Sequence, residues 1–250
     1  MTQGIKWTDR TVLCLTGQDC RSFLQDLISN DVAGAEGGLI YAALLSPQGK
    51  YLFDFFVFAE DDAWFIDVKT DRAAALAQRL VLYKLRADVT ITASDRDVAQ
   101  IWDRDAGFAD PRDVTLGRRV YGDAGPFQSA PDWDALRVAA VIPETGIELI
   151  ADDTYILEAG FERLSGVDFR KGCYVGQEVT ARMKHKTTLR KGLAQVSVSG
   201  TATPGTPLLA DGKEAGTLFT IAGALGLAHL RFDRAKIPMQ AGSAAVTYSG

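Results

Sequence analysis

The sequence is poor in the residues that build metal centres and disulfide frameworks. Its 250 residues contain only three cysteines and two histidines. Cys14, Cys20 and Cys173 are too few and too irregularly spaced for a disulfide framework or a four-thiolate metal site. His185 and His229 have no ligand partner at metal spacing. We therefore expect no metal site and a reducing compartment.

Long apolar runs and a strong excess of one charge are also absent. No apolar run approaches membrane-spanning length, and residues 1–7 lack a signal-peptide core and resemble no transit peptide. The formal net charge of -5 creates no global field that attracts nucleic acid or an anionic membrane. The composition, 47% hydrophobic and 24% charged, is that of an ordinary globular protein. These features predict a soluble, cytoplasmic protein with no membrane partner, and they argue against a nucleic-acid partner.

The first seventy residues alternate between strand and helix patterns. A buried strand over residues 11–17 leads into an amphipathic helix over residues 19–29. The apolar stripe of that helix is formed by Phe23, Leu24, Leu27 and Ile28. Residues 39–45, 51–59 and 63–68 predict three strands, and the short turns between them fit antiparallel hairpins.

Residues 71–85 predict an alanine-rich helix that is capped by Thr70 or Asp71. The side chains expected to face inward are those of Ala75, Leu76, Leu80 and Leu82. Strands over residues 88–93 and 98–102 follow this helix. A sheet, a helix and a second set of strands in this order predict a compact α+β unit.

The middle of the chain has little hydrophobic periodicity, whereas the C-terminal part has the pattern of short strands. Residues 103–131 are rich in Gly, Asp and Pro, with one strand expected at residues 116–121. Helices are predicted over residues 133–140 and 157–164, with a long connection between them of the kind that often lines a site. After Lys191, short strands separated by Gly and Pro turns predict a small antiparallel barrel or sandwich.

The stretch from Phe169 to Arg182, which reads F-R-K-G-C-Y-V-G-Q-E-V-T-A-R, has the most specific pattern in the chain. It predicts a glycine-permitted turn at Gly172 and a helix that opens near Gly176. The first amides of such a helix point outward without partners. This places Cys173 in a corner of the backbone just before a helix N-terminus.

Two interpretations of Cys173 stay open from the residues alone. Arg170, Lys171 and the helix N-terminus all favour a thiolate, which would make the sulfur reactive. An unpaired cysteine is, however, more often a small buried residue that fills a tight corner and does no chemistry. Burial decides between the two, and a sequence does not reveal it.

The string K-G-C-Y-V-G-Q-E at residues 171–178, followed by Ala181 and Arg182, closely resembles the signature of the YgfZ/GcvT-like folate-binding family. These proteins are relatives of the glycine-cleavage aminomethyltransferase (T-protein). The wider run to Leu193 is most similar to the branch associated with iron–sulfur cluster assembly. The pattern G-x-D-x-x-x-F-L-Q-x-L that begins at Gly17 also resembles the opening of the aminomethyltransferases.

The resemblance implies an α+β, three-domain, aminomethyltransferase-like fold around a central channel, with a C-terminal antiparallel β-barrel. Residues 1–37 plus 103–190 would form a discontinuous folate-binding-type domain that carries the signature. Residues 38–102 would be an inserted α+β domain, and residues 191–250 the small barrel.

The same resemblance implies a tetrahydrofolate-dependent accessory factor for iron–sulfur cluster assembly or repair that acts through the Lys171–Cys173 loop. Its partners would be folate and iron–sulfur assembly or client proteins. One thiol cannot hold a cluster alone, so a partner or an external thiol is required. Lys171 and Cys173 are the residues that the resemblance marks for catalysis. The candidates for cofactor binding lie in the signature and among the charged residues before it. They are Tyr174, Gln177, Glu178, Arg182, Arg137, Glu144 and Glu158.

The sequence departs from the aminomethyltransferase pattern at two places. Those enzymes carry an acidic pair after a glycine turn, and one member is the catalytic aspartate. Here only Asp54 follows Gly49, so enzymatic activity stays an open question with Asp54 as its catalytic candidate. The family also often shows R-x-E-x-G, in which the Glu grips the pteridine ring. Ala139 and Val141 occupy the Glu and Gly positions here, so Glu144, Glu148 or Glu158 would have to substitute.

Two other functions remain as alternatives. One is a folate-dependent one-carbon (aminomethyl-type) transferase in which Asp54 accepts a proton. The other is a binding module for RNA or protein partners. It would use the basic cluster of Lys184, His185, Lys186, Arg190 and Lys191. Structural roles also compete for single residues, since Glu178 and Arg182 are spaced to form an i,i+4 ion pair.

Overall fold

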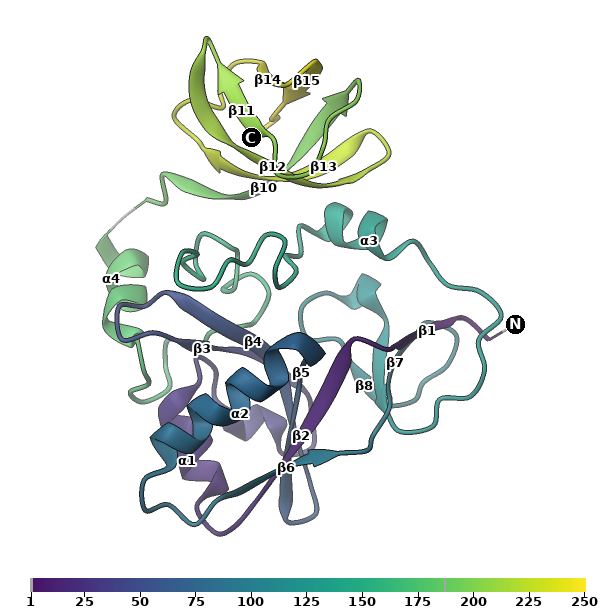
Figure 1. Ribbon diagram of the computed structural model, residues 1–250, viewed down its shortest axis with the longest axis vertical. Coiled ribbons are helices and arrows are strands. Elements are labelled where there is room, and N and C mark those ends of the chain that lie inside the picture. The colour runs from purple at the N-terminus through teal and green to yellow at the C-terminus, as the bar shows by residue number, and fades with distance from the viewer. Residues whose placement is uncertain (1, 187) are drawn as a thin grey trace.

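The protein is described by a computed structural model that covers residues 2–186 and 188–250 (Figure 1). The described strands form a five-stranded sheet, a four-stranded sheet and a closed barrel. The elements in chain order are β1 (Gly4–Trp7), β2 (Arg10–Thr16), α1 (Cys20–Leu27), η1 (Val32–Ala35), β3 (Ile40–Leu45), β4 (Tyr51–Glu60), β5 (Ala63–Lys69), α2 (Thr70–Lys84), β6 (Thr90–Ser94), β7 (Val98–Ile101), β8 (Phe108–Ala109), η2 (Val114–Leu116), β9 (Arg118–Tyr121), α3 (Trp133–Ala140), α4 (Gln177–Lys186), β10 (Lys191–Ser199), β11 (Pro207–Ala210), β12 (Lys213–Ala222), β13 (Leu225–Arg231), β14 (Met239–Ala241) and β15 (Ala244–Thr247).

The five-stranded sheet is antiparallel, has the order β3-β4-β5-β2-β6 and is covered on both faces. Strand β4 is buried without interruption from Tyr51 to Phe58, so its side chains need cover on both sides. Helices α1 and α2 cover one face through residues such as Leu24 and Leu76. The irregular chain between α3 and α4 covers the other face through Phe161 and Tyr174.

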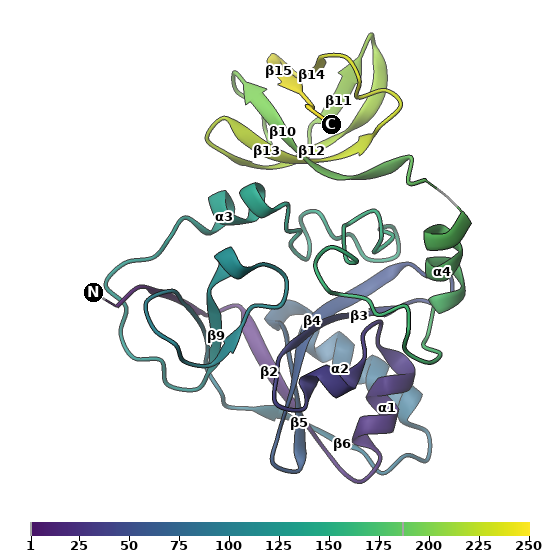
Figure 2. The same ribbon diagram turned by 180° about the vertical axis from the view of Figure 1, so that it is seen from behind.

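The second sheet has the order β1-β7-β9-β8 and lies beside the first. The barrel has the order β10-β13-β12-β11-β14-β15 and stands at one end of the molecule, on the far side of α3 from the sheets (Figures 1 and 2). The predicted C-terminal antiparallel barrel is thus confirmed, and so is the mixed fold class.

The barrel is attached to the rest of the chain by polar contacts. The amide of Leu193 donates to the carbonyl of Glu158 at 2.7 Å, and the Gln195 side chain donates to the carbonyl of Val138 at 2.9 Å. The hydroxyl of Thr220, on β12, accepts a hydrogen bond from Arg137 at 2.8 Å. These contacts fix the barrel against α3 and the chain that follows it.

Strand pairing does not follow the expected domain boundary at residue 37. Strand β2 pairs with β5 and β6, and β1 pairs with β7. The N-terminal strands β1 and β2 are therefore part of the same two sheets as the strands of residues 38–102, because they are hydrogen-bonded to them. The expected barrel boundary coincides with the start of β10 at Lys191.

Two of the helix predictions were wrong in detail. Residues 157–164 form turns instead of a helix, since Gly160 has φ +82°, a value that interrupts a right-handed helix. In α2, Leu76 and Leu80 are buried as predicted, but Ala75 is exposed and Leu82 is 66% exposed. Leu82 is two residues beyond Leu80, about 200° around the helix, so both cannot face the sheet.

The predicted side-chain cap of α2 is also absent. Lys69 occupies the N-cap position instead of Thr70 or Asp71, and its side chain makes no capping hydrogen bond. The Lys69 ammonium instead contacts the carboxylates of Asp9 and Glu144, at 2.6 and 2.8 Å. Packing of the apolar face on the sheet, and not a cap, therefore sets where this helix begins.

Candidate functional site

The signature residues form a loop that leads into α4, and this loop presents a thiol to solvent. Cys173 is exposed, whereas Cys14 is half-buried in β2 and Cys20 is buried at the start of α1. Of the two interpretations that the sequence left open, a buried filler is excluded by this placement. Cys173 is the one cysteine that a partner or reagent can reach directly.

Lys171, two residues before the thiol, is turned inward and holds the loop against helix α1. Its Nζ donates to the carbonyl oxygens of Gln25, Ile28 and Asn30 at 2.7, 2.6 and 2.9 Å. An ammonium has three N–H donors, so all of them are used. A cation at the C-terminal end of a helix is also favourable because the unpaired carbonyls there carry partial negative charge.

Burial sets the ionisation of Lys171. The residue is only 7% exposed, and burial lowers its pKa to about 8. Asp31, Asp26 and Asp168 act in the opposite direction, since a nearby negative charge favours the ammonium. Lys171 has no donor left for an external anion, because its three donors are occupied by the backbone.

Gly176 fixes the other side of the loop. It has φ +82°, and a Cβ placed on it would lie 2.6 Å from the carbonyl oxygen of Ser46. Gly172 has no positive φ and has nothing within 4 Å of an added Cβ. The turn that requires glycine is therefore at Gly176, where the loop packs on the turn between β3 and β4, and not at Gly172 as predicted.

Tyr174 and Gln177 support the loop from within. Tyr174 is 7% exposed and packs in the core on the sheet face opposite α1, and burial raises its pKa to about 12. The Lys171 ammonium lies 5.2 Å from the centre of its ring. The side-chain amide of Gln177 donates to the carbonyl of Gly172 at 3.3 Å. These contacts hold the backbone on both sides of Cys173.

The charged side chains nearest to the thiol in sequence are mostly solvated. The Arg170 side chain is 95% exposed, so it is the cation beside Cys173 that faces solvent. Glu178 and Arg182 form the i,i+4 ion pair that their spacing allows, at 2.9 Å on the surface of α4. In the basic cluster, Lys184 pairs with Glu162, and the side chain of Lys186 lies outside the described part of the chain.

Arg137, expected near a cofactor, is instead a buried structural residue. Its guanidinium donates to Asp134, Glu148, Thr220 and the carbonyl of Ile142, at distances from 2.8 to 3.3 Å. The five N–H donors of an arginine are thereby used. It joins α3 to the barrel and has no donor left for a ligand.

The three glutamates offered as substitutes for the missing pteridine acceptor are also paired, and Glu148 accepts from Arg137 at 3.1 Å. Glu144 lies 2.8 Å from the ammonium of Lys69. Burial would raise the pKa of Glu144, but Lys69, Arg137 and Arg112 together lower it below its usual value. Glu158 contacts His229 through one carboxylate oxygen at 3.2 Å. Ala139 itself is exposed on α3.

Asp54, the catalytic candidate, is buried among hydroxyl groups. Its carboxylate accepts hydrogen bonds from Tyr41 at 2.9 Å, from Tyr51 at 2.8 Å and from Thr145. The inward orientation inferred from strand alternation is correct, since the residue is 7% exposed. An inward carboxylate needs partners, and these three hydroxyls supply them.

Two cavities lie among the sequence-predicted residues. The central one is lined by Trp7, Arg10, Phe56, Lys69, Arg112, Arg119, Trp133 and Glu144, and its volume is only about 20 Å³. A cavity of this size has room for about one water molecule. The second lies between the barrel and the chain before it, with a volume of about 260 Å³. Its lining residues include Lys50, Tyr155, Glu158, Lys191, Phe219 and His229.

A buried cluster of arginines and aspartates fills the centre of the molecule, and the sequence analysis missed it. Asp67 on β5 accepts from Arg10 at 2.6 Å and from Arg119 at 2.8 Å. The guanidinium of Arg119 lies 4.0 Å from the centre of the Phe56 ring. Burial disfavours the charged carboxylate, but the two arginines lower the pKa of Asp67. The sequence feature that could have revealed this cluster is Asp67, the single acid within the apolar strand predicted over residues 63–68.

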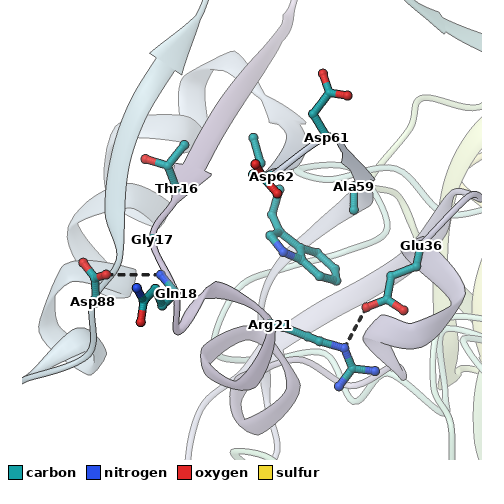
Figure 3. A pocket seen from close by; sticks show the side chains of 11 residues that line it. Thr16, Gly17, Gln18, Arg21, Glu36, Ala59, Asp61, Asp62 and Asp88 are labelled. Carbon is teal, nitrogen blue, oxygen red and sulfur yellow. Dashed lines mark hydrogen bonds and ion pairs between the residues drawn. The ribbon is translucent and has the colours of Figure 1, made fainter.

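A further hollow among the described residues is lined by none of the groups discussed so far (Figure 3). It has a volume of about 810 Å³ and is bordered by Asp61, Asp62 and Asp88, with an ion pair of 2.7 Å between Arg21 and Glu36 at one edge. None of the residues that the sequence predicted for function lines it. An acidic surface hollow of this kind is most simply a solvated face.

Neither a preformed metal site nor a membrane span is found in the described residues. No group of three or more His, Cys, Asp or Glu side chains is placed to hold a metal ion in residues 2–186 and 188–250. Within the same ranges, no helix has the length and apolar character needed to cross a membrane. Any cluster bound at Cys173 would therefore need ligands from elsewhere.

Comparison with known proteins gives both the fold and the relatives. Residues 190–249 match the family described as "CAF17, C-terminal beta-barrel domain". The crystal structure of glycine cleavage system aminomethyltransferase T from Bartonella henselae superposes with a TM-score of 0.67, over 100% of this chain and 85% of that one. The sequence identity is 12%, so this likeness shows the fold alone.

Three curated relatives carry the same name, iron-sulfur cluster assembly factor IBA57 or its homolog. The protein of Mycosarcoma maydis is 30% identical over 78% of this chain and 57% of its own length. That of Neurospora crassa is 31% identical, over 74% and 51%. That of Mus musculus is 27% identical, over 94% and 81%. The chain thus spans little more than half the length of the fungal relatives.

Taken with the signature, these matches define the class: a protein with the aminomethyltransferase fold. The fold is that of aminomethyltransferase T, as the resemblance to GcvT-like proteins implied, the barrel matches the CAF17 family, and the sequence relatives are named iron–sulfur cluster assembly factors. One expectation is corrected. We predicted a cytoplasmic location, but these relatives are all named as mitochondrial proteins.

Proposed function

We propose that this chain is an accessory factor in iron–sulfur cluster assembly or repair, and that it acts through the thiol of Cys173. The observation that carries the proposal is an exposed sulfur on a loop held at Lys171 and at Gly176. The names of the relatives support the same role. A thiol that is both accessible and held in position suits a ligand or nucleophile better than one on a mobile tail.

The number of ligands sets the chemistry of this role. Iron–sulfur clusters are held by about four cysteine thiolates, whereas Cys173 is the one exposed cysteine. The remaining ligands must come from a partner protein or from a free thiol. We therefore propose a cluster that is shared or transferred, with Cys173 as this chain's ligand.

A matched pair of cysteine variants tests the proposal. In cells that lack their own copy of the protein, Cys173→Ala should abolish the support given to cluster-dependent enzymes. Cys14→Ala, which changes a half-buried thiol in β2, should leave that support in place. Both purified variants should melt like the unmodified protein. Full enzyme activity with Cys173→Ala would refute a role for the thiol.

For tetrahydrofolate, we propose the cavity between the barrel and the rest of the chain as the binding site. The central cavity, at about 20 Å³, cannot admit a ring. The other cavity offers the ring of Phe219 for stacking, the cation Lys191 for carboxylates, and Glu158 as an acceptor. Ligand pockets usually measure about 300–1,000 Å³, so at about 260 Å³ this one would hold part of a folate.

Calorimetric titration with tetrahydrofolate and its glutamylated forms tests this site. Phe219→Ala and Lys191→Glu should each weaken binding about tenfold, since each removes one recognised group. Lys236→Glu, an exposed lysine on the barrel that does not line the cavity, is the control. No heat with the unmodified protein at millimolar ligand would remove folate from the proposed function and leave the thiol role standing.

The two alternative functions have less support. A one-carbon transferase needs a free base, yet the Asp54 carboxylate accepts from three hydroxyls and lines neither cavity. An RNA-binding module needs a free basic surface, yet Lys184 is paired with Glu162. We therefore retain the assembly role alone.

A further inference from the structure

Helix α2 exposes a group of apolar side chains at its C-terminal end, in addition to the apolar side that faces the sheet. The buried side carries Ala73, Leu76 and Leu80. The outward face carries Ala74, Ala75, Val81, Leu82 and, just after the helix, Leu85. Val81 is 57% exposed, Leu82 66% and Leu85 88%. The exposed Asp71 and Gln78 lie on the same face, so its large apolar side chains gather at the C-terminal end. A contiguous group of exposed apolar side chains marks an interaction site.

Leu85 adds a conformational anomaly to this face. It has φ +47°, in the region that favours glycine, at the position where the helix ends. Glycine or asparagine would adopt this conformation at lower cost. The chain instead places a large aliphatic side chain there and exposes it to water. Strain combined with apolar exposure is a feature of binding surfaces.

Positive charges border the outward face. Arg79 and Arg86 are exposed and Lys84 is half-buried. None of the three forms an ion pair with any residue in the described ranges of the chain. The whole chain has a net charge of -5, so the local sign is opposite to the overall one. The partner that complements this rim carries negative charge.

The positive charge around this face also disfavours a second copy of the chain as the partner that covers it. A twofold contact would place α2 against α2, because such an interface uses the same patch on both copies. Arg79 and Arg86 would then face their own equivalents, and like charges at an interface oppose binding. The apolar stripe and its basic rim therefore fit a different protein, one with an apolar ridge flanked by acids.

We infer that the outward face of α2 is the docking surface for an acidic partner protein, and this inference rests on the proposed assembly function. The thiol loop lies close by along the fold. Lys171 is bonded to the C-terminal carbonyls of α1, and α1 shares a hollow lined by Phe23 and Tyr83 with the end of α2. The C-terminal end of α2 lies toward the same lateral side as α4 and α1, with α2 nearest the viewer in Figure 1 and α4 and α1 nearest in Figure 2. We expect a partner that is anchored on α2 and extends past α1 to supply the thiols that Cys173 lacks.

Surface variants test the apolar part. Leu82→Glu combined with Leu85→Glu should reduce the support of cluster-dependent enzymes about tenfold or more, as expected for residues at the centre of an interface. Val114→Glu, which puts the same charge on a side chain that is 90% exposed elsewhere, should have no effect. Unchanged melting and unchanged alkylation of Cys173 show that the loop is intact. Full support from the double variant would overturn the inference.

Charge reversal tests the nature of the partner. Arg79→Glu with Arg86→Glu should reproduce the loss, whereas Lys213→Glu with Lys236→Glu on the barrel should not. A photo-crosslinking amino acid at position 82 should give an adduct that disappears in the Arg79/Arg86 variant, and position 114 should give none. An adduct that persists in the Arg79/Arg86 variant would contradict the inference that the partner is acidic.

The remaining outcomes identify other occupants or separate the two proposals. A concentration-dependent dimer in sedimentation that Leu82→Glu with Leu85→Glu dissociates would replace the partner by a second copy. Loss of binding to vesicles with anionic lipid in the same variant would replace it by a membrane. If Cys173→Ala retains full activity, the proposed function fails. The crosslink and its charge dependence then still decide whether α2 is a docking surface.

Discussion

Gly176 and Gly49 pack directly against each other where the thiol-bearing loop meets the turn between β3 and β4. A Cβ on Gly176 would lie 3.1 Å from the Cα of Gly49, and a Cβ on Gly49 would lie 2.7 Å from Val179. Both residues have positive φ, at +82° and +75°. The second glycine of the signature is therefore a packing and conformational requirement of the loop.

Alanine at Gly176 should destabilise the protein by about 2 kcal/mol or more, because it combines strain at positive φ with a clash against backbone. Gly172→Ala is the matched control, since the position is open and has no positive φ. Its effect should be within about 0.5 kcal/mol. Urea unfolding measures both free energies. Equal stability of the two variants would contradict the packing argument.

Removing the Lys171 ammonium should loosen the thiol loop. Lys171→Met leaves three carbonyl oxygens without their donor, and the loss should be about 2–3 kcal/mol. Arg170→Met, in a side chain that is 95% exposed, should cost within about 0.5 kcal/mol. The alkylation rate of Cys173, compared in the two variants, reports on the loop itself. An unchanged rate in Lys171→Met would show that this residue does not position the thiol.

The lowered pKa of Lys171 predicts a pH dependence of stability. Its pKa is about 8 in the folded protein and 10.5 in an unperturbed lysine. Between these values the unfolded chain binds more protons than the folded one, so the contribution of this group to stability rises with pH. The difference in unfolding free energy between the protein and Lys171→Met should therefore increase from about pH 8 to about pH 10. A difference that falls over this window would contradict the assignment.

Removal of the Thr220 hydroxyl should weaken the attachment of the barrel to α3 and the chain that follows it. Thr220 accepts from Arg137 at 2.8 Å and donates to Glu148 at 2.5 Å, and both partners are buried. Thr220→Val should cost about 1–3 kcal/mol, since it leaves part of a buried ion pair without hydrogen bonds. Thr217→Val, on the same strand but without a side-chain hydrogen bond among the described residues, is the control. Calorimetric melting that separates the barrel from the remainder measures the effect.

Local pattern was sufficient for the regular elements. The hairpins of β3, β4 and β5, helix α3 at residues 133–140 and the barrel strands follow from apolar periodicity and turn residues. The helix expected at residues 157–164 did not form, because a single glycine at positive φ outweighs local composition. The outward orientation of Leu82 also escaped prediction, since pattern alone does not say that an apolar face is left uncovered.

The signature identified the loop and its thiol but not what holds them. Lys171 finds its acceptors about 140 residues earlier in the chain, at the end of α1. Arg137 likewise reaches Thr220, which is 83 residues away. Contacts at such separations depend on how the domains pack, and no local rule contains that information. The sequence suggested catalysis for Lys171 and cofactor binding for Arg137, whereas in the fold both side chains hold distant segments together.

The turn between β3 and β4 touches both the thiol loop and the cavity beside the barrel. Gly49 packs on the thiol loop, and its neighbour Lys50 stacks over Tyr155 at 3.6 Å in the wall of the barrel-side cavity. One peptide unit therefore connects the two places. We therefore expect a ligand that displaces Lys50 to shift Gly49 and, through Gly176, the loop that carries the thiol.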